Sequence, residues 1–169
     1  GVLIAPMFRR GSTLPAAILA WLSTLASAWF AFDTRYAANA GSMFSHMVSI
    51  DSFSQYIKIL IAVFTFLIIV QWWFIGRLQE DRRDAPDFLC LILGAATGMM
   101  LMASASNLLM MAIAIESVSL PSYALAGLRK KERASAEGAL RFVIFGAASA
   151  GLTLFGISLI YGVTGSLEF

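Results

Sequence analysis

The chain has 169 residues, of which 59% are hydrophobic and 13% are charged, and its formal net charge is +2. This composition excludes a soluble globular domain and indicates a polytopic membrane protein. No acidic or basic tail suggests a nucleic-acid partner. The single cysteine, Cys90, excludes an internal disulfide and any multi-cysteine metal or iron–sulfur site within the chain.

Five apolar stretches are long enough to cross a bilayer as helices, which takes about 20 apolar residues each. They run from Leu14 to Phe32, Tyr56 to Phe74, Pro86 to Ser104, Leu108 to Leu128 and Ala139 to Gly162. None alternates apolar with polar residues, as the strands of a membrane β-barrel do. Short links between the last three stretches predict antiparallel neighbours.

The predicted fold is therefore all-α, a polytopic transmembrane helix bundle. The opening residues, Val2-Leu3-Ile4-Ala5-Pro6, are typical of the last turns of a helix. We expect one transmembrane domain fragment over residues 1–169, with five full spans and the end of a preceding helix.

Basic residues fall almost entirely on one side of the predicted membrane. The other side receives Arg35 alone, with Lys58 just inside the second span. The basic side holds Arg9, Arg10, Arg77, Arg82, Arg83, Arg129, Lys130, Lys131 and Arg133. Because basic loops stay in the cytoplasm, we expect a multi-pass protein of the cell inner (cytoplasmic) membrane, or of an organelle membrane, with its basic loops on the cytoplasmic, matrix or stromal side.

Small residues in the third and fifth spans predict close contacts between helices. Gly94 and Gly98 form a GxxxG pair, and the fifth span carries Gly146-Ala147-Ala148-Ser149-Ala150-Gly151. Small side chains let helix backbones approach closely in lipid. The alternative is that these glycines line a pore.

Glu116 lies near the middle of the fourth span. A carboxyl group at this depth is costly, so it is a functional candidate by default. The three-and-four spacing of a helix puts it on one face with Ala112, Ser119, Leu120 and Tyr123. Burial disfavours the charged form of an acid and a nearby cation favours it, so Glu116 could serve as a proton relay. The alternative is a static ion pair or hydrogen bond that orders the bundle.

Two further residues bear on this acid. Pro121 removes the hydrogen bond to the Ser117 carbonyl and predicts a kink beside Glu116. Arg141, near the cytoplasmic start of the last span, is the natural charge partner. Glu116 lies roughly 18 Å of helix from the same membrane surface, which favours a water bridge or a tilted helix over direct contact. Arg141 could instead extend its side chain to the interface.

Several motifs over Asp51 to Gly165 carry a resemblance to a known family. They are Asp51-Ser52-Phe53-Ser54, the run Gly98 to Leu109, the run Ile115 to Gly127, which includes Glu116-Ser117-Val118-Ser119-Leu120-Pro121, then Arg129-Lys130-Lys131, Ser135 to Phe142, and Gly146 to Gly165. Together they resemble subunit N of the proton-pumping NADH-quinone oxidoreductase, respiratory complex I. That family is related to subunits of multisubunit cation/proton antiporters.

The resemblance implies a role for each site residue. Glu116 falls at the family's intramembrane Glu, and Arg141 falls where the family usually has a Lys. Because arginine is effectively always protonated, Arg141 would act as an electrostatic partner rather than carry protons. The chain would correspond to the end of the first through the sixth of about fourteen helices.

The resemblance also implies which functions belong to this chain and which belong to other subunits of the complex. This chain would contribute to proton translocation coupled to quinone reduction elsewhere, with no metal or cofactor of its own. NADH, FMN, the iron–sulfur clusters and quinone would bind other subunits, and the partners would be other membrane subunits and the lipid bilayer. Two alternatives stay open: a subunit of a cation/proton antiporter, and a membrane scaffold that transports nothing.

Overall fold

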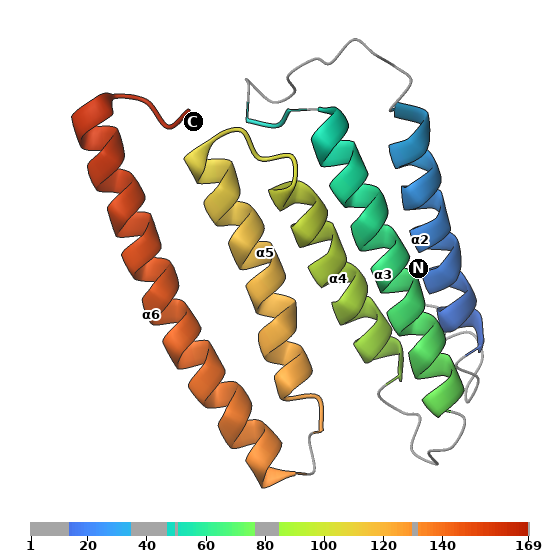
Figure 1. The fold of residues 1–169 in the computed structure, drawn as a ribbon. Coiled ribbons are helices and arrows are strands. Elements are labelled where there is room, and N and C mark those ends of the chain that lie inside the picture. Colours follow the sequence, from blue (N-terminus) through green and yellow to red (C-terminus); the bar gives the residue numbers. More distant parts are fainter. Residues whose placement is uncertain (1–13, 35–46, 50, 77–84, 130–131, 169) are drawn as a thin grey trace.

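The computed structural model describes residues 14–34, 47–49, 51–76, 85–129 and 132–168. The described ranges form five α-helices (Figure 1), which confirms the all-α prediction. The helices are α2 (Leu14–Thr34), α3 (Ser52–Gly76), α4 (Ala85–Met102), α5 (Leu108–Ala126) and α6 (Arg133–Thr164). The predicted end of a preceding helix, at residues 2–6, lies outside the described residues.

Three of the described helices are long and apolar enough to cross a membrane. They are α3 over Ser52–Phe74, α5 over Leu108–Ala126 and α6 over Arg133–Thr164. The described apolar stretches of α2 and α4 are shorter, Ala17–Trp29 and Pro86–Met102. The prediction of five full spans therefore stays a prediction for these two helices.

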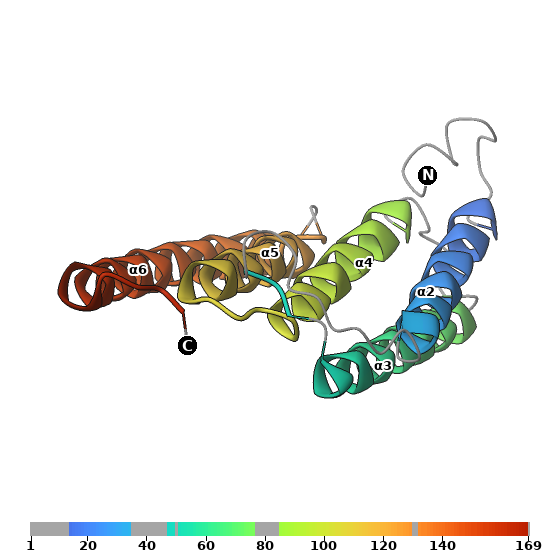
Figure 2. The same cartoon turned by 90° about the horizontal axis from the view of Figure 1, so that it is seen from above.

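The helices lie side by side in one curved layer, seen end-on in Figure 2. α4 packs against α5, α5 packs against α6, and α2, α3 and α4 all contact one another. Successive helices run antiparallel (Figure 1), as the short links predict. α6 forms one edge of the layer and the α2–α3 pair forms the other.

An aromatic cluster joins α2, α3 and α4. Trp72 stacks on Phe88 with ring centroids 5.6 Å apart, and Trp73 meets Trp21 edge to face at 5.7 Å. The rings pack around four buried side chains, Ala17, Ala20, Ile69 and Leu89. Aromatic rings bury large areas and prefer these geometries. The cluster therefore fixes the position of α4, the helix against which α5 packs.

α4 and α5 approach most closely at two glycines. A Cβ atom on Gly98 would lie 2.8 Å from Val118 Cγ2 and 2.9 Å from the backbone carbon of Ser117. One on Gly94 would lie 3.4 Å from Pro121 Cγ. The predicted role of this glycine pair in helix contact is confirmed. Ser117 and Val118, the residues against which Gly98 packs, come immediately after Glu116 in the sequence. This contact therefore fixes the position of Glu116 relative to α4.

Hydrogen bonds at one end of the bundle fix the start of α5. Asn107 caps the helix: its Oδ1 accepts from Leu109 N at 2.7 Å and from Met110 N at 3.3 Å. This cap explains why α5 begins at the predicted residue. The same link also joins two other segments: Ser49 N donates to Ser104 O, and Leu108 N donates to Leu167 O, each at 2.9 Å.

We expect Gly98→Ala to lower the thermal stability of the protein. The added methyl group would overlap the α5 backbone, and overpacking of this kind costs about 1–3 kcal/mol, more than the gain of about 1 kcal/mol in helix propensity. Gly94→Ala is the matched control, because its methyl group would make an ordinary contact with Pro121. The melting temperature of the purified protein measures both variants. Equal melting temperatures would contradict the close approach at Gly98.

Candidate functional site

Glu116 lines a cavity between α5 and α6. The cavity has a volume of about 100 Å³. α5 contributes Ala112, Ile115, Glu116, Ser119 and Tyr123, and α6 contributes Gly146, Ser149, Ala150, Thr153 and Leu154. The predicted face is confirmed for Ala112, Ser119 and Tyr123. Carboxyl, hydroxyl and phenol groups therefore line one space between two apolar helices.

Leu120 does not belong to this face, and that expectation was wrong. Its side chain is 64% exposed and lies outside the cavity lining. At about 100° per residue, the residue four positions after Glu116 is rotated about 40° to one side of it. Ala112, Ser119 and Tyr123 all lie on the other side. Glu116 thus stands at the edge of the cavity-facing stripe rather than at its centre.

Tyr123 is held by two contacts with α6. Its ring meets Phe142 edge to face, with centroids 4.8 Å apart and an interplanar angle of 81°. Its hydroxyl and the adjoining ring carbons lie against the backbone of Gly146, where a Cβ atom would be 2.9 Å from Cε1 and closer still to the hydroxyl. A side chain in place of Gly146 would therefore displace the Tyr123 ring. The predicted small-residue patch of α6 includes this glycine.

The hydrogen bonds in the cavity divide its hydroxyl groups into two kinds. Ser119 donates to Ile115 O and Thr153 donates to Ser149 O, each at 2.9 Å, so both offer only acceptor sites to the cavity. The phenol of Tyr123 and the hydroxyl of Ser149 donate to no group in the described part of the chain. Within those residues Glu116 has neither an ion pair nor a hydrogen bond.

The cavity is suited to water because its lining mixes hydrogen-bond donors with acceptors. A water molecule takes about 30 Å³ in the liquid, so there is room for about three. Such water would give the Glu116 carboxyl group the polar partners that lipid lacks. A carboxyl group in contact with a short water chain can exchange protons with it.

Pro121 lies within α5, and the helix continues past it to Ala126. The serine hydroxyls around it donate to carbonyls one turn earlier. Ser117 bonds to Ile113 O at 2.8 Å and Ser122 bonds to Val118 O at 2.8 Å. These hydroxyls therefore support neighbouring turns, and the Ser117 carbonyl that the proline leaves free is not their acceptor.

Arg141 is on the helix that faces Glu116, but outside the cavity. Its side chain is exposed, and it has no ion pair among the described residues. It precedes Gly146 by five residues, or roughly 7.5 Å of helix, on the side of the α5–α6 turn. The structure thus brings the two predicted site residues onto neighbouring helices without bringing their side chains together.

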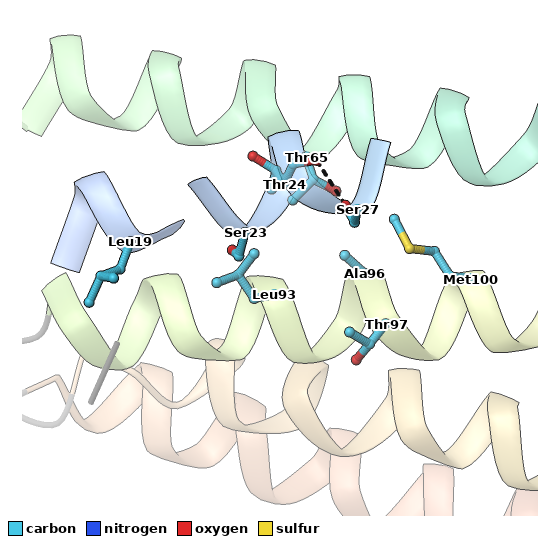
Figure 3. A pocket seen from close by; sticks show the side chains of 9 residues that line it. All are labelled: Leu19, Ser23, Thr24, Ser27, Thr65, Leu93, Ala96, Thr97 and Met100. Carbon is cyan, nitrogen blue, oxygen red and sulfur yellow. Dashed lines mark hydrogen bonds between the residues drawn. The ribbon is translucent and has the colours of Figure 1, made fainter. Parts of the chain in front are cut away.

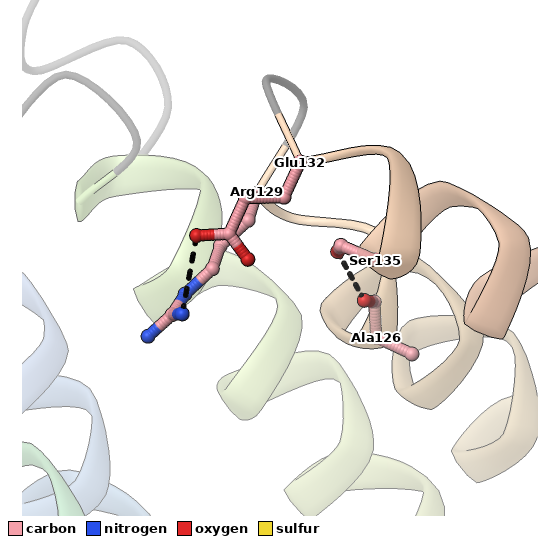
Figure 4. Close-up of polar contacts among 4 residues, drawn as sticks. All are labelled: Ala126, Arg129, Glu132 and Ser135. Atoms are coloured by element: carbon pink, nitrogen blue, oxygen red, sulfur yellow. Dashed lines mark hydrogen bonds and ion pairs between the residues drawn. The ribbon is translucent and has the colours of Figure 1, made fainter.

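The turn between α5 and α6 fixes how the two walls of the cavity are aligned (Figure 4). Ser135 Oγ donates to Ala126 O, the last residue of α5, at 2.7 Å. Arg129 and Glu132 form an ion pair at 3.4 Å within the turn, and Arg133 pairs with Glu137 at 3.0 Å. Exposed pairs of this kind contribute little to stability. The side-chain bond to the helix end is the stronger constraint on the alignment.

A second, larger cavity lies between α2, α3 and α4, with a volume of about 350 Å³ (Figure 3). Its lining includes five hydroxyl side chains, Ser23, Thr24, Ser27, Thr65 and Thr97. All five donate to carbonyls of their own helices at 2.7–2.9 Å. The lining has no ionisable side chain. The smaller cavity, which Glu116 lines, is therefore the candidate functional site.

Comparisons with known proteins identify what the chain is similar to. Residues 105–169, which include Glu116 and Arg141, match a family described as "NADH:quinone oxidoreductase/Mrp antiporter, TM". NADH-quinone oxidoreductase subunit N of Rubrobacter xylanophilus is 36% identical over 166 residues, 98% of this chain and 33% of the relative. F(420)H(2) dehydrogenase subunit N of Methanosarcina mazei is 36% identical over 125 residues, 74% of this chain and 25% of the relative.

A solved structure has the same helix arrangement. A chain of respiratory complex I from Thermus thermophilus, determined with bound aureothin, superimposes with a TM-score of 0.67 at 30% identity. The match covers 90% of this chain and 33% of that chain. This chain therefore spans about a third of the length of the relatives it matches.

We expect Gly146→Ala to disturb the cavity, because the new methyl group would collide with the Tyr123 hydroxyl and ring. The purified protein should lose thermal stability, by about 1–3 kcal/mol for overpacking at one site. Gly151→Ala is the control on the same helix, since no described atom lies within 4 Å of a Cβ there. That variant should melt at the wild-type temperature or slightly above it. A wild-type melting temperature for Gly146→Ala would contradict the close contact between Tyr123 and Gly146.

Proposed function

This chain is homologous to subunit N of NADH-quinone oxidoreductases over nearly its whole length, and from that premise we propose that it acts in proton translocation. In this proposal it acts as an antiporter-like membrane subunit, and the translocation is coupled to quinone reduction elsewhere in the complex. One observation carries the proposal: a carboxyl group within a membrane-length helix lines a hydroxyl-rich cavity between α5 and α6.

Glu116 is the intramembrane proton relay in this proposal. Its carboxyl group has no ion pair among the described residues that would hold it in the charged form. Cavity water can bring a proton to it and take one away. Changes elsewhere in the complex would shift the balance between its two protonation states. The lack of a static partner within the described part of the chain favours the relay over a structural tie.

Arg141 is the electrostatic partner of Glu116. Its charge is permanent, and α5 and α6 are adjacent helices. Charges interact over long distances where little water screens them, because the interaction energy falls only as the inverse of distance and of the dielectric constant. Arg141 can therefore interact with the Glu116 carboxyl group from outside the cavity without direct contact.

We further propose that all five helices cross the inner (cytoplasmic) membrane, with the basic loops in the cytoplasm. α2 and α4 run alongside the three apolar helices of membrane length (Figure 1). The end of α5 and the start of α6 share one end of the bundle, which includes Arg129 and Arg133. A basic end of this kind is typical of the cytoplasmic side.

The redox cofactors are proposed to bind other subunits. NADH, FMN, the iron–sulfur clusters and quinone would lie there, and the partners of this chain would be neighbouring membrane subunits and lipid. The relative from Methanosarcina mazei supports this division, since its name specifies F(420)H(2) as the substrate of the dehydrogenase rather than NADH. A subunit common to enzymes with different electron donors does not itself specify the donor.

A subunit of a cation/proton antiporter is the second candidate. The description of the family that matches residues 105–169 names Mrp antiporters as well as the oxidoreductase. Such a subunit could use the same carboxyl group for sodium exchange. The relatives over most of the chain, however, are oxidoreductase and dehydrogenase subunits. They favour coupling to electron transfer.

Glu116→Gln tests the proposal in the intact complex, reconstituted into vesicles. We expect normal assembly but a several-fold lower ratio of protons pumped to NADH oxidised, because the amide cannot exchange the proton. Glu137→Gln, an exposed carboxylate in a surface ion pair, is the control and should pump normally. If Glu116→Gln pumps as well as wild type, the relay is excluded. Loss of sodium-dependent proton exchange with intact redox-driven pumping would favour the antiporter.

The role of Arg141 is tested by changing its charge and its shape separately. Arg141→Lys keeps a cation and should retain most of the pumping, whereas Arg141→Met removes the charge and should lower it. Arg133→Met, which removes an exposed arginine from the same helix, controls for the general loss of positive charge. Equal pumping by Arg141→Met and wild type would leave Arg141 as a residue that only extends to the membrane interface.

A further inference from the structure

Tyr123 supplies the cavity with a hydrogen-bond donor that no described group takes up. Of the hydroxyl groups in the lining, those of Ser119 and Thr153 donate to their own helices, so their hydrogens point away from the cavity. The Tyr123 phenol and the Ser149 hydroxyl remain. A phenol is far more acidic than an alcohol, with a pKa near 10 in model compounds. It is therefore the stronger donor toward a carboxylate or the water beside it.

The placement of the phenol follows from helix geometry. Tyr123 and Glu116 are two turns apart on one face of α5, a rise of about 10.5 Å. Side chains on a helix lean toward its N-terminus, and because both residues do so, the leaning does not shorten this gap. The gap is too long for a direct hydrogen bond, but the cavity that both residues line has room for about three water molecules at about 30 Å³ each.

Packing alone does not account for the hydroxyl group. The edge-to-face contact with Phe142 needs only the ring, and a phenylalanine would make it equally well. The hydroxyl instead presses on Gly146, a position where any Cβ atom would displace it. Tyr123 is half-buried, and a hydroxyl group without a partner in apolar surroundings costs about 1–3 kcal/mol. Cavity water is the partner that removes this cost.

We propose that Tyr123 is a positioning residue for Glu116, acting through cavity water. Its phenol donates a hydrogen bond to the water that exchanges protons with the carboxyl group, and so holds that water in line with Glu116. The phenol keeps its own proton throughout. Phe142 and Gly146 fix the direction of the phenol. This inference rests on the proposed relay function of Glu116 and adds the water-binding residue to it.

Tyr123→Phe is the decisive variant, because it removes one oxygen atom and keeps the ring contact with Phe142. In the intact complex we expect normal assembly and about two- to tenfold less proton pumping per NADH oxidised, the effect of losing one net hydrogen bond. Tyr161→Phe, which removes an exposed phenol of α6 that is outside the cavity lining, is the matched control. It should pump as the wild type does.

Infrared spectroscopy separates a positioning role from a structural one. The carbonyl band of protonated Glu116 is assigned by its loss in Glu116→Gln. In Tyr123→Phe this band should shift, because the water bonded to the carboxyl group loses its donor, and in Tyr161→Phe it should stay in place. An unshifted band in Tyr123→Phe would overturn the inference even if pumping falls, since the loss would then come from packing.

The same variants distinguish failure of this inference from failure of the proposed function. If Glu116→Gln pumps normally, the relay itself is wrong and the inference falls with it. If Glu116→Gln loses pumping while Tyr123→Phe keeps full pumping, the relay stands and only the role of Tyr123 is overturned.

Discussion

The central constraint on this structure is the cost of a carboxyl group at membrane depth. Lipid offers no hydrogen bonds, so Glu116 needs polar surroundings supplied by protein or by water. The structure supplies them in the cavity between α5 and α6. There α6 contributes two small residues, Gly146 and Ala150, and hydroxyl groups complete the lining. Larger residues on α6 would close this space. At Gly146 this small-residue surface admits the Tyr123 hydroxyl, and the cavity that α5 and α6 line lies beside that contact.

The rest of the bundle keeps the two walls of this cavity aligned. On one side, Gly98 brings the α4 backbone against Ser117 and Val118, directly after Glu116. At the turn, Ser135 bonds to the last carbonyl of α5, and at the opposite end Leu108 N bonds to Leu167 O beyond α6. α5 is thus fixed along its length by α4 and at both ends by α6 and its extension. The proposed proton transfer through cavity water would need this alignment, because hydrogen bonds fail with shifts of well under an ångström.

Much of this could be predicted from the sequence, because membrane helices obey strong local rules. Apolar length predicts the helices and the start of α5 at Leu108, and the spacing of Gly94 and Gly98 predicts a close contact. Other features were missed for physical reasons. α6 begins at Arg133, six residues before the apolar stretch, because a helix can project beyond the lipid where apolarity no longer marks it. The pairing of Tyr123 with Gly146 depends on how two helices are rotated about their axes, which neither segment encodes alone.

The exposed position of Arg141 has a consequence for how the proposed relay works. A cation within hydrogen-bond distance would fix Glu116 in its charged form, because burying one partner of an ion pair without the other is very costly. A cation held outside the cavity acts by a weaker, longer-range attraction that cavity water can oppose. In the proposed relay, the Glu116 carboxyl group then has no ion-pair partner among the described residues to oppose proton exchange. On this argument the separation of the two residues within the structure favours proton exchange at Glu116, and a tight salt bridge at the same place would prevent it.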